Sequence, residues 1–436
     1  LGDRVGHKRT FVAGLVVFGV ASLMAAYSPT PAVLVGARVL LAIGAALLMP
    51  ATLSIIRVTF PDGHERAVAI GVWGAVCSSG AAVGPLVGGV LLEYFWWGSV
   101  FLINVPLVVV SLIAAWSLIP KSCQRPERSL DPISSVQVMG GLVGFALVVE
   151  KLGSPHPPYA VIAVVAIGTV ALLTAFVHRQ FNLRNPLIDF TLFRNRDFAL
   201  GVVTAIVAAL AIAGTELAIT QRLQLVLNYS PLQAALYILP GPLAALAGGP
   251  LAGLTLRRIG AVRAMGGALL LAGTGATGYL VCYDSGVALQ LACFAINGLG
   301  LGAAMAAASN AVMNHAPSGR EGMAASIEEV SYELGGTIGI SVFGSILSGV
   351  YTRTMVLPAG AAVPETVRDS IDHALSAAER LPSDAASAVI GLAHRAFDQA
   401  FATVVVVAAA IMLGSALLMR SVKQRSTLGE ARESKT

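Results

Sequence analysis

The chain has 436 residues, of which 56% are hydrophobic and only 12% are charged. Soluble domains carry about 25% charged residues, so this composition excludes an ordinary soluble domain and favours a protein embedded in a lipid bilayer. The net charge of +5 is accompanied by no nucleic-acid-binding motif, and the four cysteines lack the spacing of a metal site or disulfide framework.

Apolar segments recur along the whole chain between charged or Pro/Gly-rich breaks. A transmembrane helix needs about 20 mostly apolar residues, and twelve segments come close to or exceed this length. Their predicted cores are 9–27, 31–52, 68–92, 98–119, 134–150, 159–177, 198–221, 232–254, 264–281, 288–309, 323–350 and 397–420. We therefore predict an all-α integral membrane fold with 12 transmembrane helices.

The distribution of Lys and Arg predicts the orientation of these spans. With a cytoplasmic N-terminus, 21 of the 28 Lys and Arg residues fall in cytoplasmic segments, six fall outside, and Arg38 lies within a span. Cytoplasmic loops of membrane proteins carry an excess of positive charge. We therefore expect both termini to be cytoplasmic.

Only one predicted outer loop, residues 351–396, is long. Apolar residues recur at helical spacing on both sides of Pro382-Ser383, which has the character of a helix break followed by an N-cap. This pattern predicts a short amphipathic helical hairpin on the outer surface, with a flexible polar connection as the alternative.

A charged motif precedes the first predicted span and has a weaker echo later in the chain. The motif is Asp3-Arg4-x-Gly6-x-Lys8-Arg9, and residues 256–263 repeat its Arg-x-Gly pattern with Arg257 in place of Asp3. Both segments are predicted to be cytoplasmic and to precede a span. Two related halves are typical of secondary transporters built from repeats.

Several motifs together resemble the major facilitator superfamily. The opening motif resembles the one between its second and third helices, and Arg38 resembles its fourth-helix arginine motif. Residues 80–89 resemble the fifth-helix antiporter motif, and 101–106 resemble the sixth-helix signature of the 14-helix drug:proton antiporters. Residues 326–335 are similar to the thirteenth helix of exporters of quaternary ammonium compounds and methyl viologen, which the chain resembles most.

The resemblance implies a division of the chain. The twelve spans would be helices three to fourteen of a 14-helix protein, so we expect the N-terminus of a longer protein to be missing. Residues 1–120 would hold four helices of the N-terminal transporter half, 121–197 two linker helices, and 198–436 the C-terminal six-helix half with the outer loop.

The resemblance implies that Asp3, Arg4, Gly6, Lys8 and Arg9 form a conformational latch. Asp3 would meet the N-terminus of a helix of the other half in one state only. A carboxylate gains about 0.3–1 kcal/mol from a helix dipole, so this contact would bias the alternating equilibrium. A cluster of charges that only sets the topology is the alternative.

Arg38 lies inside an apolar span. The resemblance implies a role in proton-transfer coupling, with the guanidinium buried against a carboxylate or backbone carbonyls. Alternatively, the side chain reaches the membrane surface by snorkelling.

The antiporter motif contains Gly80, Gly84, Pro85, Gly88 and Gly89. Three of these glycines recur every four residues, which favours close helix packing through a face of small residues. Pro85 removes one backbone hydrogen bond and introduces a bend. The resemblance links this motif to antiport rather than uptake.

Glu328, Glu329 and Glu333 are the only charged residues in the apolar stretch 323–350. A carboxylate at the bilayer centre costs about 2.5–3.5 kcal/mol, so we expect these residues to face a water-filled cavity, a partner charge or a transported ion. Glu329 and Glu333 share a helix face, and Glu328 points about 100° away. Glu333 is the deepest, about 15 Å from Met323 by helix rise.

Crowded carboxylates away from bulk water can take up protons near neutral pH. The three glutamates therefore predict a proton-coupling and substrate-binding cluster. The alternative is a set of buried carboxylates satisfied by polar neighbours such as Tyr332.

Glu216 and two aromatic residues complete the predicted site. Glu216 lies in the outer third of its span and is either a second acidic contact for a cation or an interfacial carboxylate near Arg222. Trp73 and Tyr332 are candidates for stacking on an aromatic or quaternary cation, with packing in the core as the alternative.

Together these features predict a proton-coupled multidrug efflux antiporter. It would export lipophilic cations such as quaternary ammonium compounds, dyes and viologens by alternating access, with a narrow-range exporter or importer as the alternative. The chain has no HExxH or GxSxG motif and no His cluster in its spans, so no enzyme is expected.

We expect no catalytic residue, no metal and no cofactor, because the proton gradient would drive transport. The expected partners are the bilayer, protons and small lipophilic cations, with no nucleic acid. We expect a monomer in a bacterial inner membrane.

Overall fold

The computed structural model describes residues 6–60, 62–119, 131–152, 157–183, 186–283, 285–314, 321–357 and 364–433. Regular structure in these ranges is helical. The chain forms two compact units: residues 1–131 with 230–235, and residues 132–229 with 236–436.

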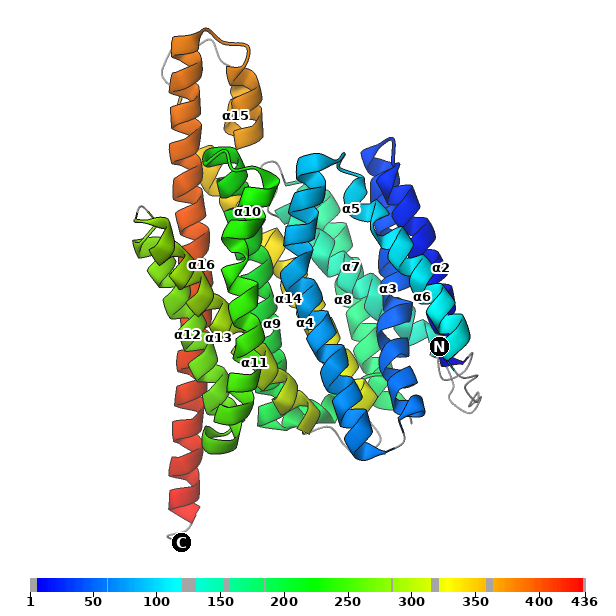
Figure 1. The fold of residues 1–436 in the computed structure, drawn as a ribbon. Helices are drawn as coiled ribbons and strands as arrows, with labels where there is room; N and C mark the ends of the chain where they lie inside the picture. The colour runs from blue at the N-terminus through cyan, green and yellow to red at the C-terminus, as the bar shows by residue number, and fades with distance from the viewer. Residues whose placement is uncertain are drawn as a thin grey trace. The chain divides into compact units, whose positions relative to one another are not determined.

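The first unit is built around α2, which packs between α3 and α6 (Figure 1). Its small core contains Leu15, Val108 and Ala115. Thr30 starts α3 by accepting a hydrogen bond from the Val33 amide through its side chain, at 3.3 Å. The helices are α2 (His7–Ala26), α3 (Pro31–Thr59), α4 (Gly63–Tyr94), α5 (Ser99–Leu102) and α6 (Asn104–Leu118).

The second unit contains the remaining helices, except that the start of α10 groups with the first unit. They are α7 (Pro132–Leu152), α8 (Tyr159–Asn182), η1 (Phe190–Arg194), α9 (Arg196–Gln221), η2 (Arg222–Val226), α10 (Pro231–Ile238), α11 (Pro240–Ile259), α12 (Ala261–Val281), α13 (Val287–Asn314), α14 (Glu321–Thr354), η3 (Glu365–Arg368), α15 (Ile371–Ala378) and α16 (Ser383–Glu433).

Small residues allow the helices of the second unit to approach closely. A Cβ atom at Gly335 of α14 would overlap the Ile206 backbone of α9, and one at Gly339 would overlap that of Leu210. Without a hydrophobic drive between helices in lipid, such close backbone contact is a main source of their association. The core between α9, α12, α13 and α16 is correspondingly rich in buried alanines.

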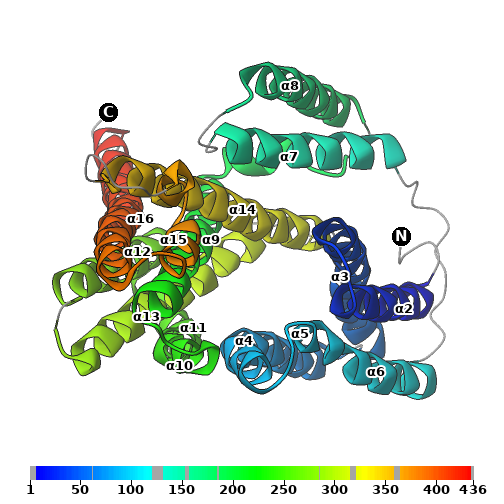
Figure 2. The same cartoon turned by 90° about the horizontal axis from the view of Figure 1, so that it is seen from above.

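The predicted linker helices α7 and α8 lie side by side (Figure 2). The buried Gln180 of α8 donates to Ser134 Oγ of α7 at 2.8 Å and accepts from the Leu187 amide at 2.7 Å. Since α7 also contacts α14, both linker helices group with the C-terminal helices rather than forming a separate part.

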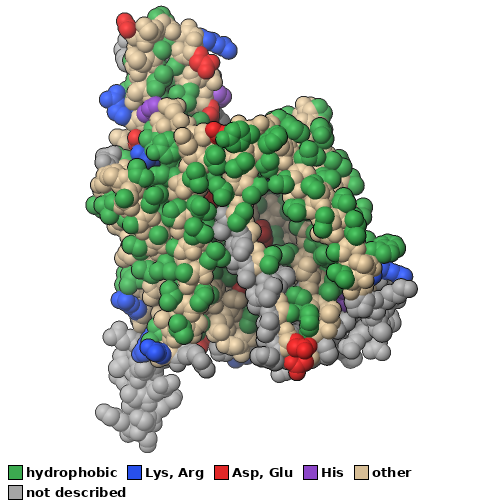
Figure 3. Space-filling model, viewed as in Figure 1, with side chains coloured by type: hydrophobic (Ala, Val, Ile, Leu, Met, Phe, Trp, Pro, Cys, Tyr) green, Lys and Arg blue, Asp and Glu red, His purple; other side chains and the backbone are tan. Residues whose placement is uncertain are grey.

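Eleven of the twelve predicted membrane spans are confirmed as long apolar helices. Eleven helices in the described part of the chain are long and apolar enough to cross a membrane, and α4 adds the shorter apolar stretch Val83–Tyr94. In the second unit, hydrophobic side chains cover the helices below the hairpin of α15 and α16, while charged and His side chains gather on the hairpin itself (Figure 3).

The predicted helical hairpin in the long loop is confirmed. Short α15 lies against the first turns of α16, with Ile371, Ala374 and Ala378 buried on one side and Val389 and Ala393 on the other. These helices project at the top of Figure 1, and we call this side of the second unit the hairpin end.

Candidate functional site

The three glutamates of α14 occupy two different environments. Glu328 is buried, with 9% of its surface exposed. The Tyr332 hydroxyl donates to its Oε1 atom at 2.9 Å and also lies 3.4 Å from the Met305 carbonyl of α13. The Ser309 hydroxyl of α13 also lies near this carboxylate. Glu328 is therefore fixed inside the second unit by α13 and its own helix.

Glu329 and Glu333 lie one turn apart and are both exposed. Within the described part of the chain, neither forms an ion pair. Exposed carboxylates in an apolar span need water or a cation beside them, because hydrocarbon cannot stabilise their charge. The predicted shared face of Glu329 and Glu333 is thus open, and Glu328 is separated from it.

Glu216 is exposed on α9, near the hairpin end. The neighbouring Gly214 is buried, and a Cβ atom there would overlap the Phe343 ring of α14. Leu217 lies near Gly344 of the same helix. The face of α9 that carries Gly214 and Leu217 therefore packs on α14, while Glu216 is accessible.

Arg38 is exposed on α3 rather than buried, so this part of its prediction is wrong. Its guanidinium carbon lies 6.0 Å from the centroid of the Phe101 ring. This distance is at the limit of a cation–π contact, which a guanidinium at an exposed site makes readily. The geometry agrees with the snorkelling alternative.

The opening motif is only partly within the described residues, since Asp3 and Arg4 lie outside them. Gly6 precedes α2 with φ of 101°, a conformation that favours glycine. Lys8 donates to the carbonyls of Trp116 at 2.9 Å and Ile119 at 2.7 Å. It thereby caps the C-terminus of α6, where a positive charge is favourable, while Arg9 is exposed.

The antiporter motif does not pack as its spacing predicts. Gly80, Gly84 and Gly88 have no described atom within 4 Å of an added Cβ. Only Gly89 is tightly packed, against the start of α10 at Pro231 and Ala235. Among the described residues, the four-residue glycine repeat thus has no close packing partner, and Pro85 lies inside a continuous helix.

The two candidate stacking residues are not brought together. The side chain of Trp73 lies outside the described part of the structure. The Tyr332 ring packs against the core of the second unit, and its hydroxyl is engaged by Glu328. In this structure Tyr332 therefore packs in the core and does not present an open aromatic face.

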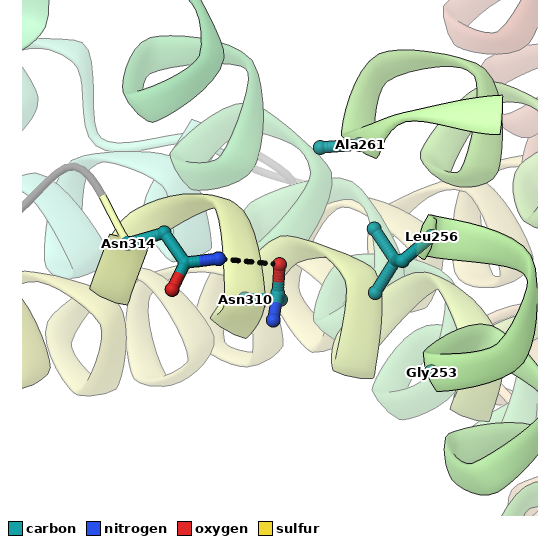
Figure 4. Close-up of a pocket in the computed structure, with 5 residues that line it drawn as sticks. All are labelled: Gly253, Leu256, Ala261, Asn310 and Asn314. Carbon is teal, nitrogen blue, oxygen red and sulfur yellow. Dashed lines mark hydrogen bonds between the residues drawn. The ribbon is translucent and has the colours of Figure 1, made fainter. Parts of the chain in front are cut away.

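A separate pocket of about 620 Å³ opens between α11, α12 and α13, far along these helices from the hairpin end. It is lined by Gly253, Leu256, Ala261, Asn310 and Asn314, and Asn314 donates to Asn310 at 2.8 Å (Figure 4). The lining includes residues of the 256–263 echo of the opening motif, but none of the predicted proton-coupling residues.

An ion pair at the hairpin end was not predicted from the sequence. The side chain of Arg222, which directly follows the predicted span 198–221, is 6% exposed, and its Nε atom lies 2.8 Å from Oδ1 of Asp398 on α16. A signal was present in the sequence: a lone carboxylate begins the last apolar stretch, and a lone arginine ends an earlier one. Because the two residues are 176 positions apart, no local pattern indicates that they pair.

The arrangement of long apolar helices in two units agrees with the comparison to known families. The model of the Major Facilitator Superfamily matches residues 1–340. The chain belongs to the major facilitator superfamily. It is accordingly a multi-pass membrane transporter and not an enzyme.

Curated superfamily relatives cover most of the chain. The methyl viologen resistance protein SmvA of Salmonella typhimurium is 37% identical over 400 residues, which are 91% of this chain and 81% of that protein. The multidrug efflux pump LfrA of Mycolicibacterium smegmatis is 33% identical over 96% of this chain and 84% of that pump.

Solved transporter structures share the fold at low sequence identity. A bacterial homologue of the human lysosomal transporter Spinster, in an inward-facing and occupied conformation, aligns with a TM-score of 0.63 and 16% identity. The alignment covers 94% of this chain and 82% of that chain. At this identity the likeness concerns the fold alone.

Proposed function

We propose that this transporter exports lipophilic cations in exchange for protons by alternating access. It would lie in a bacterial inner membrane with both termini in the cytoplasm, as the distribution of its basic residues indicates. The names of SmvA and LfrA, a methyl viologen resistance protein and a multidrug efflux pump, support drug export. Methyl viologen is itself a cation.

The observation that carries the proposal is the open acidic face of α14. Glu329 and Glu333 are exposed and four residues apart in an otherwise apolar span. Side chains at this spacing have Cβ atoms about 5–6 Å apart, so both carboxylates can approach one bound cation. A proton and an organic cation would compete for the same negative charge, and this competition is the basis of exchange.

Glu328 has a different role in this proposal. Its carboxylate is already engaged by Tyr332 and lies against α13. It would hold α14 in position while Glu329 and Glu333 exchange their ligands. Exposed Glu216 on α9 would offer a second acidic contact to a cation that leaves toward the outside.

Efflux from cells tests this assignment. The complete gene product is expressed in an exporter-deficient bacterium, and ethidium efflux is followed with and without a protonophore. We expect efflux to collapse with the protonophore and to fall to the background level in Glu329→Gln and Glu333→Gln. Glu150→Gln is the matched control, because Glu150 is an exposed carboxylate whose ion pair is with the adjacent Lys151.

Two results would refute the proposal. Efflux that persists in both glutamine variants would remove the acidic face from the mechanism. Ethidium uptake in place of efflux would favour an importer on the same fold. Each variant is quantified in the membrane fraction, so that a loss of protein is not mistaken for a loss of transport.

The remaining motif roles are proposals of the same kind. Asp3 and Arg4 would latch one state, so Asp3→Asn should slow turnover while substrate binding is kept. Equal loss of binding would contradict the latch. Arg38 and the antiporter motif would contribute to proton coupling, and a transporter driven by the proton gradient would need no cofactor.

A further inference from the structure

Arg222 is an arginine enclosed almost completely by its own protein. It lies at the junction of α9 and η2, where the helix widens into a π-helical turn, and only 5% of its surface is exposed. A buried guanidinium is strongly unfavourable unless its charge and donors are satisfied. We therefore expect the residues around Arg222 to satisfy both its charge and its N–H donors.

A carboxylate contacts Arg222 on one side. Asp398 of α16 accepts from Nε of Arg222 at 2.8 Å, and 29% of its side chain is exposed. The short distance is that of a charge-assisted hydrogen bond, which is about twice as strong as a neutral one. The charge of the guanidinium is thus matched by a residue 176 positions later in the chain.

Two further walls are aromatic. The guanidinium carbon lies 5.1 Å from the ring centroid of Tyr283 and 5.3 Å from that of Phe401. Both distances fall within the range of about 6 Å for a cation–π contact. The ring of Tyr279 lies 6.0 Å from that of Phe401 at an interplanar angle of 82°, and its hydroxyl lies near Arg222.

The aromatic walls are themselves fixed from behind. Tyr279 lies 4.6 Å from Phe294 between ring centroids. Gln290 of α13 donates to the carbonyls of Tyr283 at 2.7 Å and Ser285 at 2.9 Å, and it accepts from the Tyr237 hydroxyl. The walls thus keep their shape without depending on the arginine alone.

We propose that Asp398, Tyr279, Tyr283 and Phe401 form a preorganised cation box, shaped for a planar guanidinium and occupied by Arg222. Through this box, the hairpin end of α9 is held on α12 and α16. Beyond the box the chain changes direction, since Asn228 adopts a φ of 54° before α10 begins. The box therefore anchors the end of α9 a few residues before this turn.

The proposal requires only the fold of the second unit and is independent of the transport assignment. The box should also distinguish a guanidinium group from an ammonium group. Lys carries the same charge as Arg but lacks the planar group that stacks on aromatic rings. A box selective for shape should accept a guanidinium compound and discriminate against an ammonium compound of equal charge.

Chemical rescue tests the box in the purified full chain. Arg222→Ala leaves the box vacant, and we expect its melting temperature in detergent to fall well below that of the wild type. Millimolar methylguanidinium should restore most of this loss, whereas methylammonium at the same ionic strength should not. The double variant Arg222→Ala with Asp398→Asn should lose the rescue, and Lys151→Ala serves as an exposed ion-pair control with an unchanged melting temperature.

Equal rescue by both cations, or rescue that survives in the double variant, would overturn the proposal. If Arg222→Ala yields no folded protein, Arg222→Lys provides a second measurement by hydrogen exchange. We expect faster exchange in residues 216–229 and unchanged exchange in α2 and α6. Unchanged exchange in residues 216–229 would also overturn the proposal, whatever the transport assay gives.

Discussion

The helices α14 and α4 are both rich in glycine at helical spacing, but they use it in opposite ways. On α14, Gly335 and Gly339 are buried against the backbone of α9, and an added Cβ at either position would overlap that backbone. On α4, an added Cβ at Gly80, Gly84 or Gly88 would meet no described atom within 4 Å. The same spacing thus accompanies a closed contact in one helix and an open face in the other.

The difference shows what glycine spacing alone does not specify. A row of small residues permits a close helix contact, but the contact forms only where a second helix presents a backbone at the matching height. In α14 the buried Glu328 lies two turns before Gly335, on the same side as the closed contact, whereas Glu329 and Glu333 are exposed. Substitutions on these faces should therefore have very different costs.

The largest expected effect comes from closing the α14 contact. The double variant Gly335→Ala with Gly339→Ala places two methyl groups against the backbone of α9. Overpacking of this kind costs about 1–3 kcal/mol per site. We expect a marked loss of monodisperse protein after heating, measured by size-exclusion chromatography of the detergent-solubilised chain.

Gly349→Ala is the matched control for this variant. Gly349 lies on the same helix, but an added Cβ there has no described atom within 4 Å. A loss of stability as large as that of the double variant would show that α14 tolerates no side chain at any glycine, and the comparison of faces would fail.

The next effect concerns the hydrogen bond on the packed side of α14. Tyr332→Phe removes the hydroxyl that donates to Glu328 and leaves a buried carboxylate short of one donor. An unsatisfied buried group costs about 1–3 kcal/mol. The melting temperature should fall in Tyr332→Phe, whereas Glu329→Gln on the exposed face should change it little. A larger fall in Glu329→Gln than in Tyr332→Phe would contradict the buried environment of Glu328 and the exposed environment of Glu329.

A smaller effect is expected in the first unit, at the cap of α6. Lys8→Met removes a positive charge from the carbonyls of Trp116 and Ile119. The interaction of one charge with a helix terminus is worth about 0.3–1 kcal/mol. Thermal unfolding should show a modest loss for Lys8→Met and almost none for Arg9→Met, because Arg9 is exposed. Similar losses in both variants would contradict the capping role.

The sequence predicts the helices of this transporter better than their contacts. The spans follow from apolar length, which the bilayer dictates locally, and the hairpin of α15 and α16 follows from helical spacing. The face shared by Glu329 and Glu333 also follows, because helix geometry fixes which residues share a side. Each of these inferences uses residues that are close in the sequence.

The missed features all join distant residues. The pairing of Arg222 with Asp398 depends on how α9 and α16 pack, and neither residue has a local pattern that reveals the other. Lys8 was assigned to a latch as part of a motif, while its hydrogen bonds go to the end of α6. For Glu328, the alternative of a buried carboxylate satisfied by Tyr332 agrees with the structure and follows from the four-residue spacing, whereas the contact with α13 does not follow from any spacing within α14.

The open face of α4 should tolerate substitution without loss of stability. Ala is favoured over Gly in a helix by about 0.5–1 kcal/mol, so Gly84→Ala should melt at the same temperature as the wild type or slightly higher.

The open face would nevertheless have a function if it closes against another helix in a second conformation. In that case ethidium efflux should fall in Gly84→Ala while the melting temperature is kept, since the added methyl group would obstruct only the closed state. Unchanged efflux together with unchanged stability would show that this face is open throughout the cycle, and the contrast with α14 would then hold in every state.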